Sequence, residues 1–150
     1  MSSRKLIVGF FVGLALFAIA LWYFQTYAFY RDLPRRDLTI AGQVYKVTEW
    51  RGTHASSSPL KLRVCLSVVP ETAVAIAKAH EPGTGAEPLV APGWFDCFDA
   101  AAIGADLEAG RALAYALGPT ESDGIDAWLA LYPDGRGFLW HQLNARFARQ

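Results

Sequence analysis

The chain has 150 residues, of which 53% are hydrophobic and 19% charged, and its formal net charge is zero. This length allows one domain of ordinary size plus a short additional element. Residues 38–150 carry 9 basic and 12 acidic side chains, a net charge of −3, which excludes the basic surface that nucleic-acid binding requires.

An uncharged stretch, residues 6–30, predicts a transmembrane helix. At about 1.5 Å per residue it would extend about 37 Å, more than the hydrocarbon core of about 30 Å. Its far end is rich in aromatic residues, which prefer the headgroup level: Trp22, Tyr23, Phe24, Tyr27, Phe29 and Tyr30. A cleaved signal peptide is the alternative, because Ala18-Ile19-Ala20 resembles a cleavage site. The apolar run continues past Ala20, however, so an uncleaved anchor is preferred.

The orientation of this helix depends on the basic residues at its two ends. Residues 1–5 contain Arg4 and Lys5, whereas Arg31, Arg35 and Arg36 follow the span. These similar numbers of basic residues do not determine the orientation. A short basic tail before a first hydrophobic segment usually stays in the cytoplasm. We therefore expect a cytoplasmic N-terminus and an exported body.

Small residues within the span could form a helix-contact face. Gly9, Gly13 and Ala20 fall on one side of a helix, so a partner helix could approach closely there. This partner would be a second copy or another membrane protein. The alternative is ordinary membrane-helix composition, since Phe17 interrupts the stripe.

Residues 31–37 are interpreted as a short stalk, in which Pro34 ends the helix. The remaining residues, 38–150, are expected to form one α+β domain. Alternating or β-branched segments predict about five strands, at 38–50, 60–69, 111–117, 125–132 and 137–144, with residues 51–59 and 81–93 as loops. In the second strand, Arg63 and Cys65 share the polar face. The expected sheet is mainly antiparallel.

Two short helices complete the prediction. The first begins at Pro70, and the second is capped by Asp99 and ended by Gly110. Residues 133–136 contain proline followed two positions later by glycine, which predicts a hairpin turn. We expect both helices to cover one face of the sheet.

The two cysteines, Cys65 and Cys97, allow several interpretations. A reactive thiol at Cys97 is disfavoured by the neighbouring acids, and zinc binding lacks ligands at suitable spacing. Two buried free thiols would suit a cytoplasmic domain. A disulfide suits an exported one and is preferred, and closing a loop of about 32 residues would stabilise the domain by roughly 3–4 kcal/mol.

No catalytic signature accompanies the cysteines. The chain lacks a P-loop, a Gly-x-Ser-x-Gly motif, His-Glu-x-x-His and paired-cysteine metal motifs. His80 suits a helix C-terminus and His141 a partly buried strand position, while Asp123 and Asp126 are typical of a turn. We expect no cofactor, no metal and no catalytic residue.

The segments "EPLVAPGWFDCFDAAAIGADLEAG" (87–110) and "PDGRGFLWHQLN" (133–144) carry a family resemblance. Together with the opening span, they resemble a family of small single-pass bacterial membrane proteins known as a domain of unknown function. The resemblance implies one domain in the bacterial inner membrane and no established activity. Members are sometimes labelled histidine kinases, but this chain has no room for an ATP-binding domain.

These observations favour a membrane-anchored, non-enzymatic accessory or protein-interaction domain. The alternative is a thiol-dependent redox or small-ligand-binding protein of the periplasm. The expected partners are the membrane itself and another membrane protein, with no nucleic acid.

Overall fold

The computed structural model describes residues 2–148 and divides the chain into two compact units, with the boundary between Tyr30 and Arg31. The first unit is the helix α1 (Ser3–Tyr23), which continues as a π-helix, η1 (Phe24–Ala28). Compared with the predicted range 6–30, the helix begins earlier and ends two residues sooner. Arg4 and Lys5 are included because both are good helix formers.

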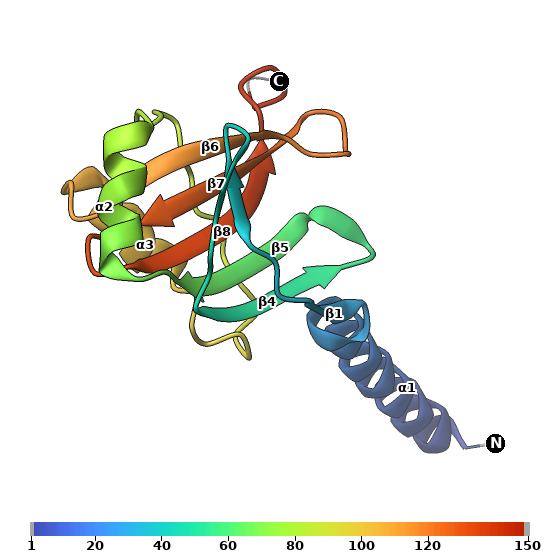
Figure 1. Cartoon of the computed structure of the whole chain (residues 1–150). Coiled ribbons are helices and arrows are strands. Elements are labelled where there is room, and N and C mark those ends of the chain that lie inside the picture. Colours follow the sequence, from blue (N-terminus) through green and yellow to red (C-terminus); the bar gives the residue numbers. More distant parts are fainter. Residues whose placement is uncertain (1, 149–150) are drawn as a thin grey trace. The chain divides into compact units, whose positions relative to one another are not determined.

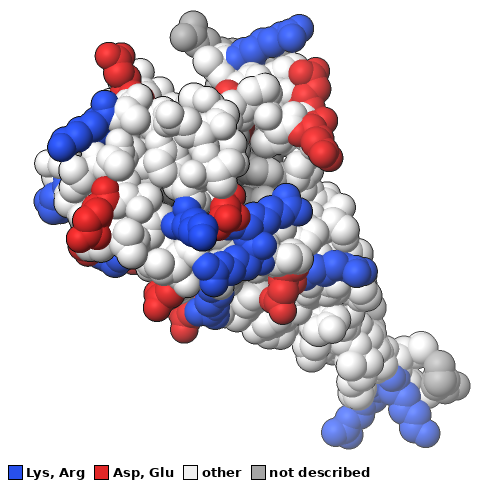
Figure 2. All heavy atoms as spheres, in the orientation of Figure 1, with Lys and Arg blue, Asp and Glu red and all other residues white. Residues whose placement is uncertain are grey.

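α1 has no buried residue. Figure 2 shows its uncharged surface, with basic side chains at its N-terminal end. Ser3–Ala28 is the one helix among the described residues that is long and apolar enough to cross a membrane. A signal sequence near the N-terminus would meet the same criteria.

The second unit is built on a six-stranded sheet with the strand order β1-β4-β5-β8-β7-β6 (Figure 1). The α+β class and the mainly antiparallel sheet are confirmed, because β4/β5, β5/β8, β7/β8 and β6/β7 all pair antiparallel. The strands are β1 (Tyr30–Leu33), β4 (Glu49–Ala55), β5 (Ser58–Ser67), β6 (Leu113–Pro119), β7 (Ile125–Leu131) and β8 (Arg136–Leu143).

The strand predicted at 38–50 is divided in the structure. β2 (Leu38–Ile40) and β3 (Gln43–Tyr45) form a separate antiparallel hairpin. Its turn contains Ala41 at φ +47° and Gly42 at φ +83°. The last residues of the predicted strand belong to β4, and the main sheet has six strands where about five were expected.

Residues 51–59 are not the predicted loop, because β4 and β5 pair through most of this segment. Gly52 and the serines resemble loop residues, yet Gly52 is required for packing. A Cβ there would lie 3.0 Å from the Leu33 Cβ. The glycine therefore lets β1 pack closely against β4.

The segment 31–37 also differs from the expected stalk, since its first residues belong to β1. The Trp50 indole donates to the Leu33 carbonyl at 2.9 Å, and the Thr53 hydroxyl donates to the Arg31 carbonyl at 3.2 Å. These tertiary bonds attach Arg31–Leu33 to the folded unit. Residues 34–37 have no regular structure.

The two helices cover opposite faces of the sheet, so the expectation of one covered face was wrong. α2 (Pro70–Ala79) places Ile76 in one core, with Val64 and Leu129. α3 (Ala100–Glu108) places Ile103 in the other, with Trp140. The 80–99 loop, which links the helices, crosses between these faces, with α2 in front of the sheet and α3 behind it in Figure 1.

The local signals that position these elements are confirmed. The Asp99 carboxylate accepts a hydrogen bond from the Ala102 N–H at 3.0 Å and caps α3. Gly110 follows α3 at φ +71°, and Pro70 is the first residue of α2. At the predicted hairpin turn, the Gly135 N–H donates to the Tyr132 carbonyl at 3.0 Å.

Candidate functional site

A disulfide joins Cys65, in the middle of β5, to Cys97, in the 80–99 loop. The two Cα atoms are 6.3 Å apart, within the usual range for a disulfide. Both cysteines are partly exposed. The bond therefore fastens the loop to the sheet and remains in contact with solvent.

The disulfide lies in the wall of an open cavity of about 440 Å³, which Arg51 and Arg136 also line. Arg51 Nη1 lies 2.6 Å from Asp96 Oδ1. This hydrogen bond is the largest cause of the lowered pKa of Asp96, with the charge of Arg51 second. The Arg51 guanidinium also lies 5.0 Å from the centre of the Phe95 ring, a cation–π distance.

Both acids beside Cys97 are thus engaged. Asp96 pairs with Arg51, and Asp99 caps α3. We expected these carboxylates to raise the pKa of a free thiol at Cys97. With one neutralised by an arginine and the other hydrogen-bonded to a backbone amide, that electrostatic objection to thiol chemistry is weaker than the sequence indicates.

Arg63 holds the same loop from inside the fold. The side chain lies on the face of β5 that carries Cys65, but it is only 4% exposed. Its Nε donates to the Leu89 carbonyl at 2.8 Å and its Nη2 to the Val90 carbonyl at 3.1 Å. Its Nη1 donates to the carbonyls of Leu60 and Leu62 at 2.7 and 2.6 Å. The buried guanidinium therefore connects two segments of backbone.

Gln142 attaches the beginning of the loop and is 8% exposed. Its Nε2 donates to the Gly85 carbonyl at 2.8 Å, while its Oε1 accepts from the Glu87 N–H at 2.7 Å. The Trp140 indole donates to the same oxygen at 2.9 Å. Disulfide, arginine and glutamine together hold a segment that has no regular secondary structure.

Sequence reasoning missed Arg63 and Gln142 as structural residues. The available signal was their strand phase: Arg63 shares its face with Cys65, and Gln142 shares its face with Trp140. A strand face that carries a cysteine or a tryptophan is often covered. The loop carbonyls that bind Arg63 are more than 25 residues away in sequence, and no local pattern indicates them.

The proposed contact residues of the membrane segment, Gly9, Gly13 and Ala20, all lie in α1 and are exposed. A Cβ at either glycine would meet nothing within 4 Å. The face is thus accessible within the first unit, and its use by a partner stays a prediction.

The histidines do not converge on a site. His80 Nε2 lies 2.8 Å from the Tyr45 hydroxyl, and His141 Nδ1 lies 2.8 Å from the Pro59 carbonyl. Burial is the main cause of the lowered pKa of His141. Within residues 2–148, no three His, Cys, Asp or Glu side chains are grouped so that they could hold a metal ion.

A polar network fixes α3 against the sheet. The Tyr132 hydroxyl donates to Asp106 Oδ2 at 2.6 Å, and Arg111 Nε lies 2.7 Å from Asp106 Oδ1. Burial, followed by the bond to Asp106, raises the pKa of Tyr132 to about 12. The hydrogen bond from Tyr132 is in turn the main cause of the lowered pKa of Asp106. Arg136 stacks 4.5 Å from the Tyr132 ring centre.

A model described as a family of unknown function (DUF6446) matches residues 38–150. The match begins at β2 and includes the disulfide, Arg63, Gln142 and the loop that they hold. It does not include α1 or β1. No curated protein and no solved structure matches the chain.

Proposed function

The chain belongs to the DUF6446 family of unknown function, and from that premise we propose that it is a membrane-anchored, non-enzymatic accessory domain that binds another protein. The observation that supports this function is the restrained 80–99 loop. Loops frequently carry binding residues, and a loop that is already ordered loses little conformational entropy on binding.

Val90 is the residue that this loop presents most clearly. Its side chain is 83% exposed, although its own carbonyl is held by Arg63. An apolar side chain is thus displayed to solvent from a fixed backbone. Such an arrangement suits contact with an apolar pocket on a partner.

The experiment is site-specific photocrosslinking in intact membranes. A benzoylphenylalanine at Val90 should give a crosslinked protein of defined mass. The matched control is the same amino acid at Val44, another exposed valine, 66% accessible, in the β2–β3 hairpin. Equal crosslinking at both positions, or none at Val90, would overturn the proposal.

We further propose that α1 is an uncleaved anchor in the bacterial inner membrane, with the second unit in the periplasm. The basic residues at its start and the apolar length of the helix support the anchor. The cysteine pair supports an oxidising compartment. The face of Gly9, Gly13 and Ala20 would contact a partner helix.

That contact is tested by Gly9→Ile with Gly13→Ile, which keeps the helix apolar but blocks close approach. We expect weaker crosslinking of the full chain to itself or to its membrane partner. The control is Ala18→Ile with Leu14→Ile, which changes other positions of the same helix. Undiminished crosslinking of the glycine variant would show that the face is not used.

A second candidate is thiol-dependent redox exchange, which one observation favours: both cysteines line the open cavity beside Arg51 and Arg136. A redox titration separates the two functions. A purely structural disulfide should have a potential below about −300 mV, and an exchanging one a potential near those of thiol oxidoreductases, about −270 to −120 mV.

A further inference from the structure

A second opening lies between α2 and the segment that leads into β6. Its volume is about 380 Å³, within the range of small-ligand sites, about 300–1,000 Å³. Val74 and Ala77 of α2 form one wall, and Ala112 and Leu113 form the other. We call this opening the α2–β6 groove. It lies on α2, whereas the 80–99 loop packs in the core on the opposite face of the sheet.

The walls of the groove are apolar yet accessible. Val74 is 47% exposed and Leu113 is 38% exposed. Both side chains are aliphatic, so the groove presents apolar surface to solvent. A ligand with an apolar body would remove this surface from water, which is favourable in proportion to the area covered.

Tyr115 provides a polar group within this apolar lining. The residue is only 2% exposed and contributes to the lining of the groove. In the part of the chain that the structure describes, no residue hydrogen-bonds its hydroxyl. A buried tyrosine hydroxyl usually has a partner.

The Tyr115 hydroxyl is not sealed from solvent. Among residues 2–148, no side-chain oxygen or nitrogen is both buried from solvent and without a hydrogen bond, so this hydroxyl must reach the surface. Tyr115 lines the groove, and we infer that its hydroxyl reaches solvent there. Burial raises the pKa of Tyr115, so the hydroxyl keeps its proton at neutral pH and is available as a donor.

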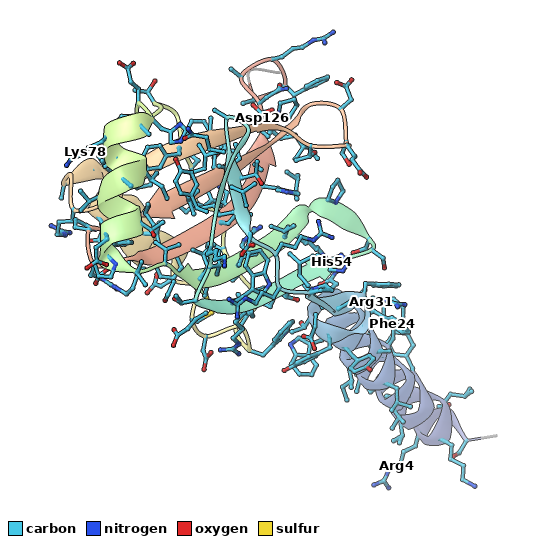
Figure 3. All side chains as sticks on the ribbon, viewed as in Figure 1. Arg4, Phe24, Arg31, His54, Lys78 and Asp126 are labelled. Carbon is cyan, nitrogen blue, oxygen red and sulfur yellow. A yellow bond between two sulfur atoms is a disulfide. The ribbon has the colours of Figure 1, made fainter. Side chains whose placement is uncertain are left out.

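Lys78 adds a positive charge at the rim. It lies in the last turn of α2 and lines the groove, and Figure 3 shows it extending from that helix. No described acidic residue forms an ion pair with it. Arg111, the other cation of the lining, is already paired with Asp106. The groove thus combines apolar walls, one hydroxyl donor from a largely buried tyrosine and one available cation.

We propose that the α2–β6 groove binds a small organic carboxylate with an aromatic or branched aliphatic body. The body would lie between Val74 and Leu113, and the carboxylate would accept from the Tyr115 hydroxyl and face Lys78. The size of the groove favours a free small molecule over a longer peptide. This site is separate from Val90, so either proposal can fail without the other.

The test uses the full chain in phosphatidylcholine nanodiscs and 4-phenylbutyrate as the probe, followed by saturation-transfer NMR. Empty nanodiscs measure uptake by the lipid. We expect saturable binding of the carboxylate and at least about tenfold weaker binding of the neutral amide, 4-phenylbutyramide, because a charged hydrogen-bond acceptor is lost. Equal affinities of the two probes, or no signal above empty nanodiscs, would overturn the proposal.

Three variants locate the binding. Tyr115→Phe removes only the hydroxyl and should weaken 4-phenylbutyrate binding about tenfold. Ala77→Trp fills the groove from an exposed position and should abolish binding, whereas Ala75→Trp, at an exposed alanine of α2 outside the lining, should not. Unchanged binding by Ala77→Trp would place the probe elsewhere and refute the site.

A peptide arm distinguishes the source of the carboxylate. The peptide Gly-Gly-Phe is compared with its C-terminal amide under the same conditions. Binding of the free peptide without binding of 4-phenylbutyrate would mean that the groove takes a protein C-terminus, and the small-molecule assignment would be wrong. Binding of 4-phenylbutyrate alone supports it.

Discussion

A Cβ atom on Gly135 would lie 2.0 Å from the carbonyl oxygen of Val68. The close approach has a structural purpose, because the Val68 N–H donates to the Gly135 carbonyl at 2.8 Å. This bond attaches the β7–β8 turn to the chain just before α2. Only glycine combines the approach with φ +94°.

Gly135→Ala should therefore lower the free energy of unfolding by about 3 kcal/mol or more, since it combines a steric clash with left-handed backbone strain. Urea titration of the full chain in detergent, followed by tryptophan fluorescence, measures it. The matched control is Gly104→Ala within α3, where a Cβ meets nothing within 4 Å and where stability should rise by about 0.5–1 kcal/mol. Equal effects would contradict this interpretation of Gly135.

The disulfide predicts that denatured, unreduced protein gains no mass from a maleimide. Cys97→Ser should then lower the free energy of unfolding by about 2–5 kcal/mol. Mass spectrometry and urea titration provide the two measurements. Two added labels would show free thiols in the protein as purified. An unchanged stability of Cys97→Ser would show that the remaining bonds of the loop suffice.

Arg63→Gln should destabilise the domain by about 2–4 kcal/mol, because several carbonyls lose their donor in a buried environment. Protease cleavage should also become faster between residues 80 and 99 in particular. A general loss of stability would not confine the faster cleavage to this loop. Arg111→Gln is the control. Arg111 is 62% exposed and pairs with Asp106, so this change should cost no more than about 1 kcal/mol.

The raised pKa of Tyr132 predicts a loss of stability in alkali. In the unfolded chain the tyrosine releases its proton near pH 10, but in the folded protein near pH 12. Its stabilising contribution is complete below pH 10 and decreases as the pH rises toward 12, because only the unfolded state ionises in that window. Unfolding titrations of wild type and Tyr132→Phe across pH 9–12 should converge. A stability difference between the two proteins that stays constant across this pH range would contradict the raised pKa of Tyr132.

The orientation is tested by separate C-terminal fusions to alkaline phosphatase and to green fluorescent protein. A periplasmic body should give an active phosphatase and a dark fluorescent fusion, because the phosphatase folds after export and the fluorescent protein does not. The opposite pair of results would reverse the orientation and would place the cysteines in a reducing compartment.

Local signals made much of this fold predictable. Pro70, Asp99 and Gly110 mark the ends of α2 and α3, and residues 133–136 form the turn, because each signal acts within a few residues. Most of β4 was missed because Gly52 and the serines resemble a loop. Only pairing with β5 and packing of Leu33 reveal that segment as a strand.

The residues of the candidate sites are brought together by contacts between distant segments, so only some of them could be predicted from the sequence. The cysteine pair was predicted from the presence of two cysteines and from the expected export of the domain. The burial of Arg63 did not, since its carbonyl partners lie in an irregular loop. Tyr115 could not be recognised either, because whether a hydroxyl has a hydrogen-bond partner depends on all the groups that the fold brings around it.

The position of β8 has a consequence for the order of synthesis. Of the strands that the structure describes, β8 is made last, yet it lies between β5 and β7 in the middle of the sheet. Until residues 136–143 emerge, the β4–β5 and β6–β7 pairs each keep an unpaired edge, and edges of this kind invite aggregation. Gln142 lies in the same strand, so its hydrogen bonds to the 80–99 loop cannot form until that strand has been translated. A nascent chain is therefore open to edge-to-edge pairing until β8 has been translated.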